Sequence, residues 1–574
     1  MRQLQCDVLV VGAGLAGCWA AVRARELVSK VILVDIAKVS RSGKSSFSGA
    51  GILAPDSSDD LDAWQEEIVE KGQYIGDQDW VRLMLEDQAA RLDDMGRWGM
   101  KFEYDKDGKV LRHFGLNHSN TKIITVDSLE MMEAMRRRLE ELGVTLLERV
   151  MITDLLTSDG ATPTEGSVVG AVGFNTRTGE TFAINSGATI IATGSTGLFS
   201  ASGEGIMQAF KAGAEVIGME FSRCFDEMWF VEKTMGIGLH INTFQRLGMK
   251  LVNSQGYRFM ESYFPELMER GRREDLGLAM ACEGMQGRAP LYIDMRHIDR
   301  ESMDKLHTLP TTAWMISAME DDGHYLAKEA IKCGVASGRL WVTVGGIRNN
   351  IYGESNVPGL YAAGEAGGFP AHGTYSVGGV NLASCCVGGY RAGEFAAKYA
   401  AENGRATVET NQAKEAEERA LRPLKRKSGL RPDDFADEVH GFLSPARISI
   451  FKNAASIQKV LDSIGDWNQR ARRLRAEDPY ELVKANRLVA YIRCIDLVFR
   501  GHLAREETRA NNIRIDFPYK DNINWLKWIV QWADGHGKPL MKKVPVPLHR
   551  YPVRPKERAR IPAEFPFLKI DGEQ

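Results

Sequence analysis

The sequence predicts a large α/β protein that begins with a Rossmann-like dinucleotide-binding domain and ends in a helical part. The apolar run Cys6–Val11 has strand length and is followed at once by the pattern G-x-G-x-x-G from residue 12. A second apolar run, residues 31–34, ends at Asp35. Near the C-terminus, apolar residues recur at helical spacing over residues 482–498, directly after a helix-start signal. These patterns are typical of a strand, turn and helix unit at one end and of a long helix at the other.

The glycine pattern has a physical reason at each position. Gly12 permits a tight turn, Gly14 lets the backbone reach a pyrophosphate, and Gly17 lets the following helix pack closely on the strand. The carboxylate of Asp35 stands where it can accept a hydrogen bond from a ribose hydroxyl. A bare glycine-rich turn is the alternative for the first motif, but the second strand and its acid favour a dinucleotide site.

Length and composition exclude several classes of protein. A chain of 574 residues is too long for one ordinary core. Apolar residues make up 44% and charged residues 26%, which fits a globular protein, and no long uncharged apolar stretch suggests a transmembrane segment. The net charge of −3 argues against a nucleic-acid partner.

The cysteines and the start of the sequence give two further expectations. The eight cysteines are scattered, without a C-x-x-C pair, so we expect reduced thiols and no iron–sulfur cluster or other metal site on this chain. The first strand begins almost at residue 1, without a signal-peptide pattern, and we expect a cytoplasmic protein.

Several distant segments together resemble one known family. They are Ala188–Gly194, Ser202–Gly205, Leu251–Met260, Val357–Glu365 and Arg514–Pro518. In this order they are similar to the succinate dehydrogenase/fumarate reductase flavoprotein family, of which this chain looks like a divergent member. The resemblance extends to about residue 530.

The resemblance implies an FAD-binding domain that is interrupted by an α+β capping domain and followed by a helical domain. A charged, proline-containing linker and a basic, proline-rich tail complete the predicted organisation. We expect the tail to lie extended, with a partner-binding arm and a solvated tail as the two alternatives. The predicted boundaries are 1–215 plus 340–405 for the FAD-binding domain, 216–339 for the capping domain, 406–434 for the linker, 435–540 for the helical domain and 541–574 for the tail.

The resemblance also implies cofactor contacts. Asp35 would hold the adenosine ribose and Glu365 the flavin end, while Asn381 and Leu382 would pass close to the isoalloxazine ring. The predicted cofactor-binding residues are Gly12, Gly14, Gly17, Asp35, Ser42, Gly43, Lys44, Gly49, Gly194, Glu204, Glu365, Asn381 and Leu382.

We expect the FAD to be bound without a covalent link. Family members that tether FAD use a histidine in the serine-rich segment after the second strand, and here residues 40–49 contain none. Hydroxyls and backbone amides in this segment suit phosphate and flavin hydrogen bonding.

The residues with which family members hold a dicarboxylate are replaced in this chain. Phe225, Trp341 and Ser376 stand where the family has two histidines and an arginine. Because a dicarboxylate in a dry site needs its charge matched, the sequence predicts that succinate and fumarate are not substrates. A shift of the alignment that brings His324 or His372 into the site is the alternative.

Four residues are the candidates for substrate contact or proton transfer. His372 titrates near neutral pH, and the Tyr375 hydroxyl can donate to a developing oxyanion. Arg246 and Arg258 could anchor an anion or pass a proton. Arg258 follows a turn-like Gln255–Gly256, so a salt bridge is its structural alternative.

The sequence therefore predicts an FAD-dependent oxidoreductase subunit that acts on a small organic molecule. With no second nucleotide motif and no cluster ligands, we expect electrons to pass to or from an iron–sulfur partner protein, through which the chain could also reach a membrane surface. Three alternatives remain: a protein like the alpha chain of adenylylsulfate reductase, a stand-alone flavin oxidase or reductase, and an electron-transfer or bifurcating scaffold within a larger complex.

Overall fold

A computed structural model of the protein describes residues 1–49, 51–115, 118–197, 201–223, 228–230, 241–309, 312–335, 342–408 and 410–563. Phe225 and Trp341, two of the residues on which the dicarboxylate prediction depends, lie outside this part of the chain.

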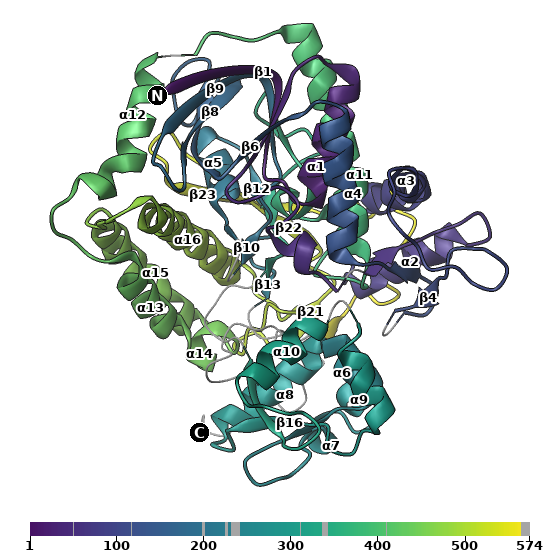
Figure 1. The fold of residues 1–574 in the computed structure, drawn as a ribbon. Helices are drawn as coiled ribbons and strands as arrows, with labels where there is room; N and C mark the ends of the chain where they lie inside the picture. The colour runs from purple at the N-terminus through teal and green to yellow at the C-terminus, as the bar shows by residue number, and fades with distance from the viewer. Residues whose placement is uncertain are drawn as a thin grey trace.

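A seven-stranded sheet forms the centre of the N-terminal domain (Figure 1). Its order is β6-β2-β1-β9-β8-β7, and β20 pairs with the end of β9. The strands β6, β2, β1, β9 and β20 are parallel, whereas β7, β8 and β9 form an antiparallel meander. The inner part of β1, Val8–Val11, is buried, as expected of a central parallel strand. The strand bounds are β1 Arg2–Val11, β2 Val31–Asp35, β6 Thr145–Glu148, β7 Val150–Thr157, β8 Val168–Asn175, β9 Thr181–Ile191 and β20 Leu360–Ala362.

Helices α1, α4 and α11 lie together on one side of this sheet (Figure 1). Helices α1 and α11 approach closely, because a side chain at Gly389 would meet the carbonyl oxygen of Ala16 at 2.3 Å. The helices of this domain are α1 Leu15–Leu27, α2 Leu61–Lys71, α3 Gln78–Arg97, α4 Ser128–Glu141, α5 Glu204–Ala212 and α11 Val380–Asn403, with the short 3-10 turns Lys44–Phe47, Gly364–Gly367 and Pro370–His372. The small strands are β3 Gly51–Leu53, β4 His113–Phe114, β5 Lys122–Thr125, β10 Thr196–Gly197, β11 Ala201–Ser202, β13 Ser222–Arg223 and β18 Val342–Thr343.

The capping domain lies at one end of the molecule, with its own antiparallel sheet β14-β17-β16-β15 (Figure 1). Its apolar core is separate from those of the N-terminal domain and includes Phe244, Phe259 and Ile293. Its elements are β14 Met228–Phe230, α6 Ile241–Leu247, β15 Lys250–Val252, α7 Met260–Tyr263, α8 Arg273–Met285, β16 Leu291–Asp294, α9 Arg300–Leu306, α10 Ala313–Asp321 and β17 Ile331–Val335, with a 3-10 turn over Met268–Arg270.

The helical domain packs on the side of the sheet that carries α5 (Figure 1). The predicted long helix is confirmed as α16, Pro479–Ala504, and the side chain of Asp478 caps its start by accepting from Glu481 N. The other helices are α13 Pro432–Leu443, α14 Ala446–Ser449 and α15 Ala454–Ala471.

The segment predicted as a linker, 406–434, is not irregular throughout. It contains helix α12, Thr410–Leu421, and a 3-10 turn over Arg422–Lys425. The alanines Ala413 and Ala416 are buried against β7, β8 and β9. The sequence suggested a linker because most of its residues are charged, but one narrow alanine face is enough for a helix that rests on a sheet.

The C-terminal residues pack at the two connections between the N-terminal and capping domains. Strand β22 pairs with β12, which also pairs with β19, and these two short strands lie where the chain leaves the N-terminal domain and comes back to it. The predicted tail begins inside β23 and then passes the start of α3, where the Tyr551 hydroxyl donates to Asp77 at 2.8 Å. The strands are β12 Val216–Ile217, β19 Gly346–Ile347, β21 Tyr519–Asp521, β22 Lys527–Ala533, β23 Pro539–Pro545 and β24 Arg560–Pro562.

Among the residues that the structure describes, no helix is long and apolar enough to cross a membrane.

Candidate functional site

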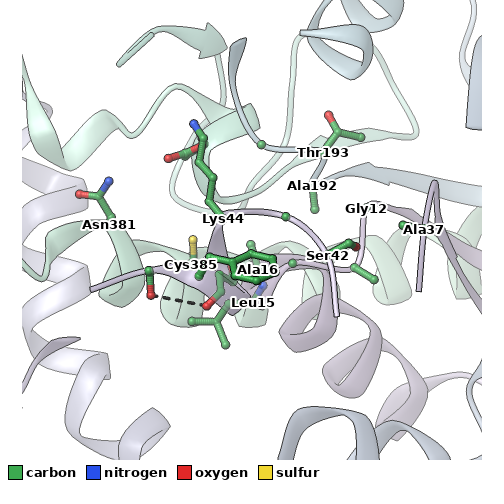
Figure 2. A pocket seen from close by; sticks show the side chains of 18 of the residues that line it. Gly12, Leu15, Ala16, Ala37, Ser42, Lys44, Ala192, Thr193, Asn381 and Cys385 are labelled. Atoms are coloured by element: carbon green, nitrogen blue, oxygen red, sulfur yellow. Dashed lines mark hydrogen bonds and ion pairs between the residues drawn. The ribbon is translucent and has the colours of Figure 1, made fainter. Parts of the chain in front are cut away.

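One large cavity opens at the carboxyl edge of the parallel strands. Its volume is about 1530 Å³, and residues of the N-terminal, capping and helical domains all line it. Figure 2 shows Ala37 and Asn381 at opposite sides of the view, with Lys44 between them and with Ala192 and Thr193 above Gly12. The cavity thus runs from the end of β2 toward the start of α11.

Most of the predicted site residues meet in this cavity, although they come from segments far apart in the sequence. The predicted residues that line it are Gly12, Gly14, Asp35, Ser42, Gly43, Lys44, Gly49, Gly194, Glu204, Arg246, Glu365, Tyr375, Asn381 and Leu382. Gly17, Arg258 and His372 are not among its described lining residues.

The turn after β1 can be built only from glycine at two positions. Gly12 has φ +101°, and a side chain there would stand 2.5 Å from the carbonyl oxygen of Ala192. A side chain at Gly17 would stand 1.8 Å from the carbonyl oxygen of Gly12, so Gly17 serves helix packing rather than the cavity wall. Helix α1 therefore starts directly at the cavity, where its first backbone N–H groups suit an anion.

Asp35 fixes the end of β2 against this turn. Its carboxylate accepts hydrogen bonds from Ala13 N, from Ala37 N and from the Ser42 hydroxyl, at 2.8, 2.8 and 2.9 Å. Burial raises the pKa of Asp35 above its ordinary value, although these donors oppose the rise. A carboxylate has about four lone-pair positions, so this one can still accept from a ribose hydroxyl.

The serine-rich segment crosses the middle of the cavity. The Ser45 hydroxyl accepts from Leu15 N at 3.1 Å, which ties the segment to the start of α1. Lys44 Nζ donates to Glu365 Oε2 at 2.9 Å and to the Ser195 hydroxyl at 3.2 Å. Residues 44, 195 and 365 therefore form one cluster.

The Glu365 carboxylate is charged and held by this cluster. Burial disfavours its charged form, but the Lys44 ammonium and the donors of Ser195 outweigh burial, so the pKa of Glu365 lies below its ordinary value. The neighbouring thiol behaves differently, because burial and the charge of Glu365 raise the pKa of Cys385. Cys385 is thus a neutral thiol at physiological pH.

His372 does not contact the cavity in the way that the sequence predicted. It is fully buried, and its Nδ1 accepts from Ser376 N at 2.9 Å. Because a backbone N–H can only donate, Nδ1 carries no proton, and the other ring nitrogen, Nε2, donates to Asn381 Oδ1. Both ring nitrogens are thereby engaged, and the prediction of direct substrate contact by His372 is corrected.

His372 instead supports two residues that do line the cavity. It bonds Asn381, and its ring is stacked on that of Tyr375 with centroids 4.5 Å apart. Tyr375 has φ +110°, a conformation that side chains rarely adopt and that surrounding contacts must hold. His372 therefore contacts the cavity only through Asn381 and Tyr375 among the described lining residues.

The capping domain closes the other side of the cavity with basic residues. Arg246, one of the candidates for substrate contact, lines the cavity together with Arg273 and Lys305. Arg258 does not, because its guanidinium is held by Glu269, with Nη2 to Oε2 at 2.6 Å. The structural alternative for Arg258, a salt bridge within the capping domain, is the one observed.

Sequence reasoning missed several lining residues. Arg273 and Lys305 lie on different helices of the capping domain and belong to no motif, and Trp314 is an exposed aromatic residue on α10. Tyr480 and Arg487 of α16 line the opposite end. The only sequence signal near them was the helix start at Asp478, which says nothing about a cavity.

The cavity fits a dinucleotide. Its volume exceeds the roughly 300–1,000 Å³ that is usual for a single small-molecule site. The glycine turn at an anion-binding helix start and the acid at the end of the next strand are the two features that a dinucleotide needs. Thr193 adds a buried hydroxyl without a hydrogen-bond partner in the cavity wall.

Comparison with known families decides the assignment. Residues 7–382 match the FAD binding domain family, and residues 444–560 match the C-terminal domain of fumarate reductase flavoproteins. The chain belongs to this flavoprotein family. The cofactor of the family is FAD, and its members are oxidoreductases, so both predictions are confirmed.

Curated relatives of this flavoprotein extend over nearly its full length. It is 29% identical to one of the subunits of the CoM/CoB fumarate reductase of Methanothermobacter marburgensis, over 90% of this chain and 95% of that one. It is 26% identical to a fumarate reductase flavoprotein subunit of Mycobacterium tuberculosis, over 96% and 98%.

Solved structures share the fold at lower identity. A mutant of the quinol fumarate reductase protein FrdA of E. coli superposes with a TM-score of 0.85 at 22% identity, covering 97% of this chain and 99% of that one. Adenylylsulfate reductase of Archaeoglobus fulgidus superposes with a TM-score of 0.74 at 19% identity, over 95% and 96%. The predicted fold of FAD-binding, capping and helical domains is confirmed.

The Lys44–Glu365 pair makes a prediction about stability. We expect Lys44→Met to lower the free energy of unfolding at pH 7 by about 1–3 kcal/mol, because a buried carboxylate loses a charged donor. The difference from the wild type should shrink as the pH falls toward 4, since protonated Glu365 no longer needs the ammonium. Urea unfolding midpoints at pH 7, 6 and 5 measure this.

Lys71→Met is the matched control. Lys71 and Lys44 have similarly exposed side chains, 33% and 32%, and each pairs with a largely buried glutamate, 3% and 13% exposed. The partner of Lys71, Glu67, also accepts from the backbone N–H groups of Ser119, Asn120 and Thr121. We therefore expect Lys71→Met to lower the free energy of unfolding by less than Lys44→Met does. Equal losses in the two variants, or a Lys44→Met difference that does not change with pH, would contradict the prediction.

Proposed function

We propose that this chain is the flavoprotein subunit of an oxidoreductase that exchanges a hydride between an organic substrate and non-covalent FAD. The electrons pass to or from an iron–sulfur partner protein. One observation carries the proposal: a single cavity continues from the glycine turn and Asp35 to Tyr375 and Asn381, and on to the basic residues of the capping domain. Cofactor and substrate would share that cavity.

The cofactor would lie along the carboxyl edge of the sheet. The start of α1 would bind the pyrophosphate, Asp35 the ribose, and Glu365, Asn381 and Leu382 the flavin end. When bound, FAD supplies two-electron chemistry in which a hydride is accepted or donated. Non-covalent binding is supported by the lining itself, because no described lining residue is a histidine and the Cys385 thiol is neutral.

The substrate would lie between the flavin end and the capping domain. Tyr375, held in place by the buried His372, would offer its hydroxyl from the flavin side. Arg246, which lines the cavity as Arg273 and Lys305 do, would attract an anionic group from the capping side. Burial and the charge of Arg246 both lower the pKa of His113, so that histidine stays neutral and leaves Arg246 as the cation there.

Ser376 supports the proposal that succinate and fumarate are not the substrates. It stands where the family resemblance implies a substrate-binding arginine, and its uncharged hydroxyl lies 2.9 Å from His372 Nδ1. The basic residues that line the described cavity lie instead on the capping domain and at Lys44, Arg41, Arg177 and Arg487.

Fumarate reduction is the second candidate. Two observations favour it: several curated relatives are named fumarate reductases, and three basic residues of the capping domain line the cavity and could match a dicarboxylate. The two candidates differ in a direct assay.

We predict no measurable succinate oxidation or fumarate reduction by the purified FAD-loaded protein, with its partner, at millimolar substrate. Charge-assisted hydrogen bonds contribute about 1.5–3 kcal/mol each. With Phe225, Trp341 and Ser376 in place of the two histidines and the arginine, a dicarboxylate would lose three of them, which costs on the order of 5 kcal/mol, or several thousandfold in binding. Photoreduction of the flavin in the same sample shows that the cofactor is competent. Saturable turnover with a submillimolar KM would overturn the prediction and establish the second candidate.

The partner is tested by gentle purification of a tagged chain from its native cells. We expect a second polypeptide that contains iron and acid-labile sulfide, and we expect the pair to reduce a dye with electrons from the substrate faster than the chain alone. If the chain is recovered by itself and reacts with oxygen at the same rate in extract and in pure form, the proposal of an iron–sulfur partner is wrong. The chain would then be a stand-alone enzyme.

A further inference from the structure

The helical domain forms one wall of the cavity at the end that lies beyond Asp35. Asp478, Pro479, Tyr480, Val483 and Arg487 line the cavity there, and all of them lie at the start of α16 or in its first turns. Because the Asp478 carboxylate accepts from Glu481 N at 2.8 Å, the first turn of this helix is fixed.

Apolar contacts anchor the start of α16 to the strand ends of the N-terminal domain. Leu482 and Val483 are buried with Met151 and Phe174 of strands β7 and β8, and Ile36 packs against the same cluster. Ile36 directly follows Asp35. The position of this helix is therefore coupled to that of the carboxylate at the end of β2.

A charged contact also connects α16 with the N-terminal domain. Arg487 Nε donates to Glu204 Oε1 at 2.8 Å, and Glu204 is a buried residue at the start of α5. The positive charge of Arg487 is also close enough to Asp35 to oppose the effect of burial on that carboxylate. The Arg487 guanidinium thus connects α16 with the start of α5 and with the end of β2 at this end of the cavity.

Tyr480 presents an aromatic ring at the same place. It is 65% exposed, more than any other large hydrophobic residue described in the chain, and it nevertheless lines the cavity. Lys484 Nζ lies 4.7 Å from the centre of its ring. An exposed aromatic ring at the wall of a nucleotide cavity suits contact with a planar base.

We propose that the start of α16 belongs to the cofactor site and retains FAD through its adenosine half, with Tyr480 at the base and Arg487 on the ribose and phosphate side. In a dinucleotide fold the pyrophosphate lies at the first helix and the ribose at the acid that ends the second strand, so the adenosine half points toward this wall. The inference rests on the proposed function only in requiring non-covalent FAD. The helical domain would thus help to retain FAD, as the covalent bond does in flavoproteins that tether their cofactor.

The test measures how fast FAD leaves the full-length holoprotein. The purified protein is diluted, and the rise of free-flavin fluorescence gives the release rate, which does not depend on turnover. We expect Tyr480→Ala and Arg487→Gln each to raise the rate by about tenfold or more, and Tyr480→Phe to keep it within about twofold of the wild type.

Two variants serve as matched controls. Tyr104 has a similar exposure, 60%, but does not line the cavity, and Arg500 is paired with Asp496 on α16 itself. Tyr104→Ala and Arg500→Gln should leave the release rate unchanged.

The outcomes separate this inference from the proposed function. If Tyr480→Ala and Arg487→Gln release FAD no faster than the controls while the wild type carries FAD, the role of α16 is wrong and the proposed function stands. If Tyr480→Phe releases FAD as fast as Tyr480→Ala, the aromatic ring is not what holds the cofactor, which also overturns the inference. If the wild type carries no FAD, the proposed function itself fails.

Discussion

The parallel pairing of β2, β1, β9 and β20 is the constraint on which the site depends. It brings the carboxyl ends of these strands, at residues 35, 11, 191 and 362, to one edge of the sheet. The turn after β1 passes so close to the segment after β9 that only glycine fits at position 12, and Gly17 lets α1 pack against that turn. The Lys44–Glu365 pair then joins two of these loops across the cavity, and Ser195 joins a third.

Local chemistry explains why the cofactor half of the site could be predicted from sequence. The glycine turn and Asp35 lie within one strand, turn, helix and strand unit, so their spacing along the chain determines their geometry. Glu365, Asn381 and Leu382 are far from this unit in sequence and were placed only by family resemblance. The helix at 479–504 was also predictable, because its cap and its apolar period are local.

The substrate half could not be predicted in the same way, because tertiary contacts determine it. His372 has the residue type of a proton-transfer group, but hydrogen bonds from Ser376 and to Asn381 fix its tautomer and bury it. Arg246 and Arg258 look alike in sequence, yet Arg258 is held by the buried Glu269, whereas Arg246 reaches the cavity wall. The role of α16 at the cavity follows from how the helical domain docks, which no local pattern encodes.

Acid precipitation of the purified full-length protein tests most directly whether these separate segments build one non-covalent FAD site. We expect a yellow protein with a flavin spectrum that, after precipitation, leaves about one FAD per chain in the supernatant and a colourless pellet. A colourless protein, or flavin that remains bound to the pellet, would contradict this.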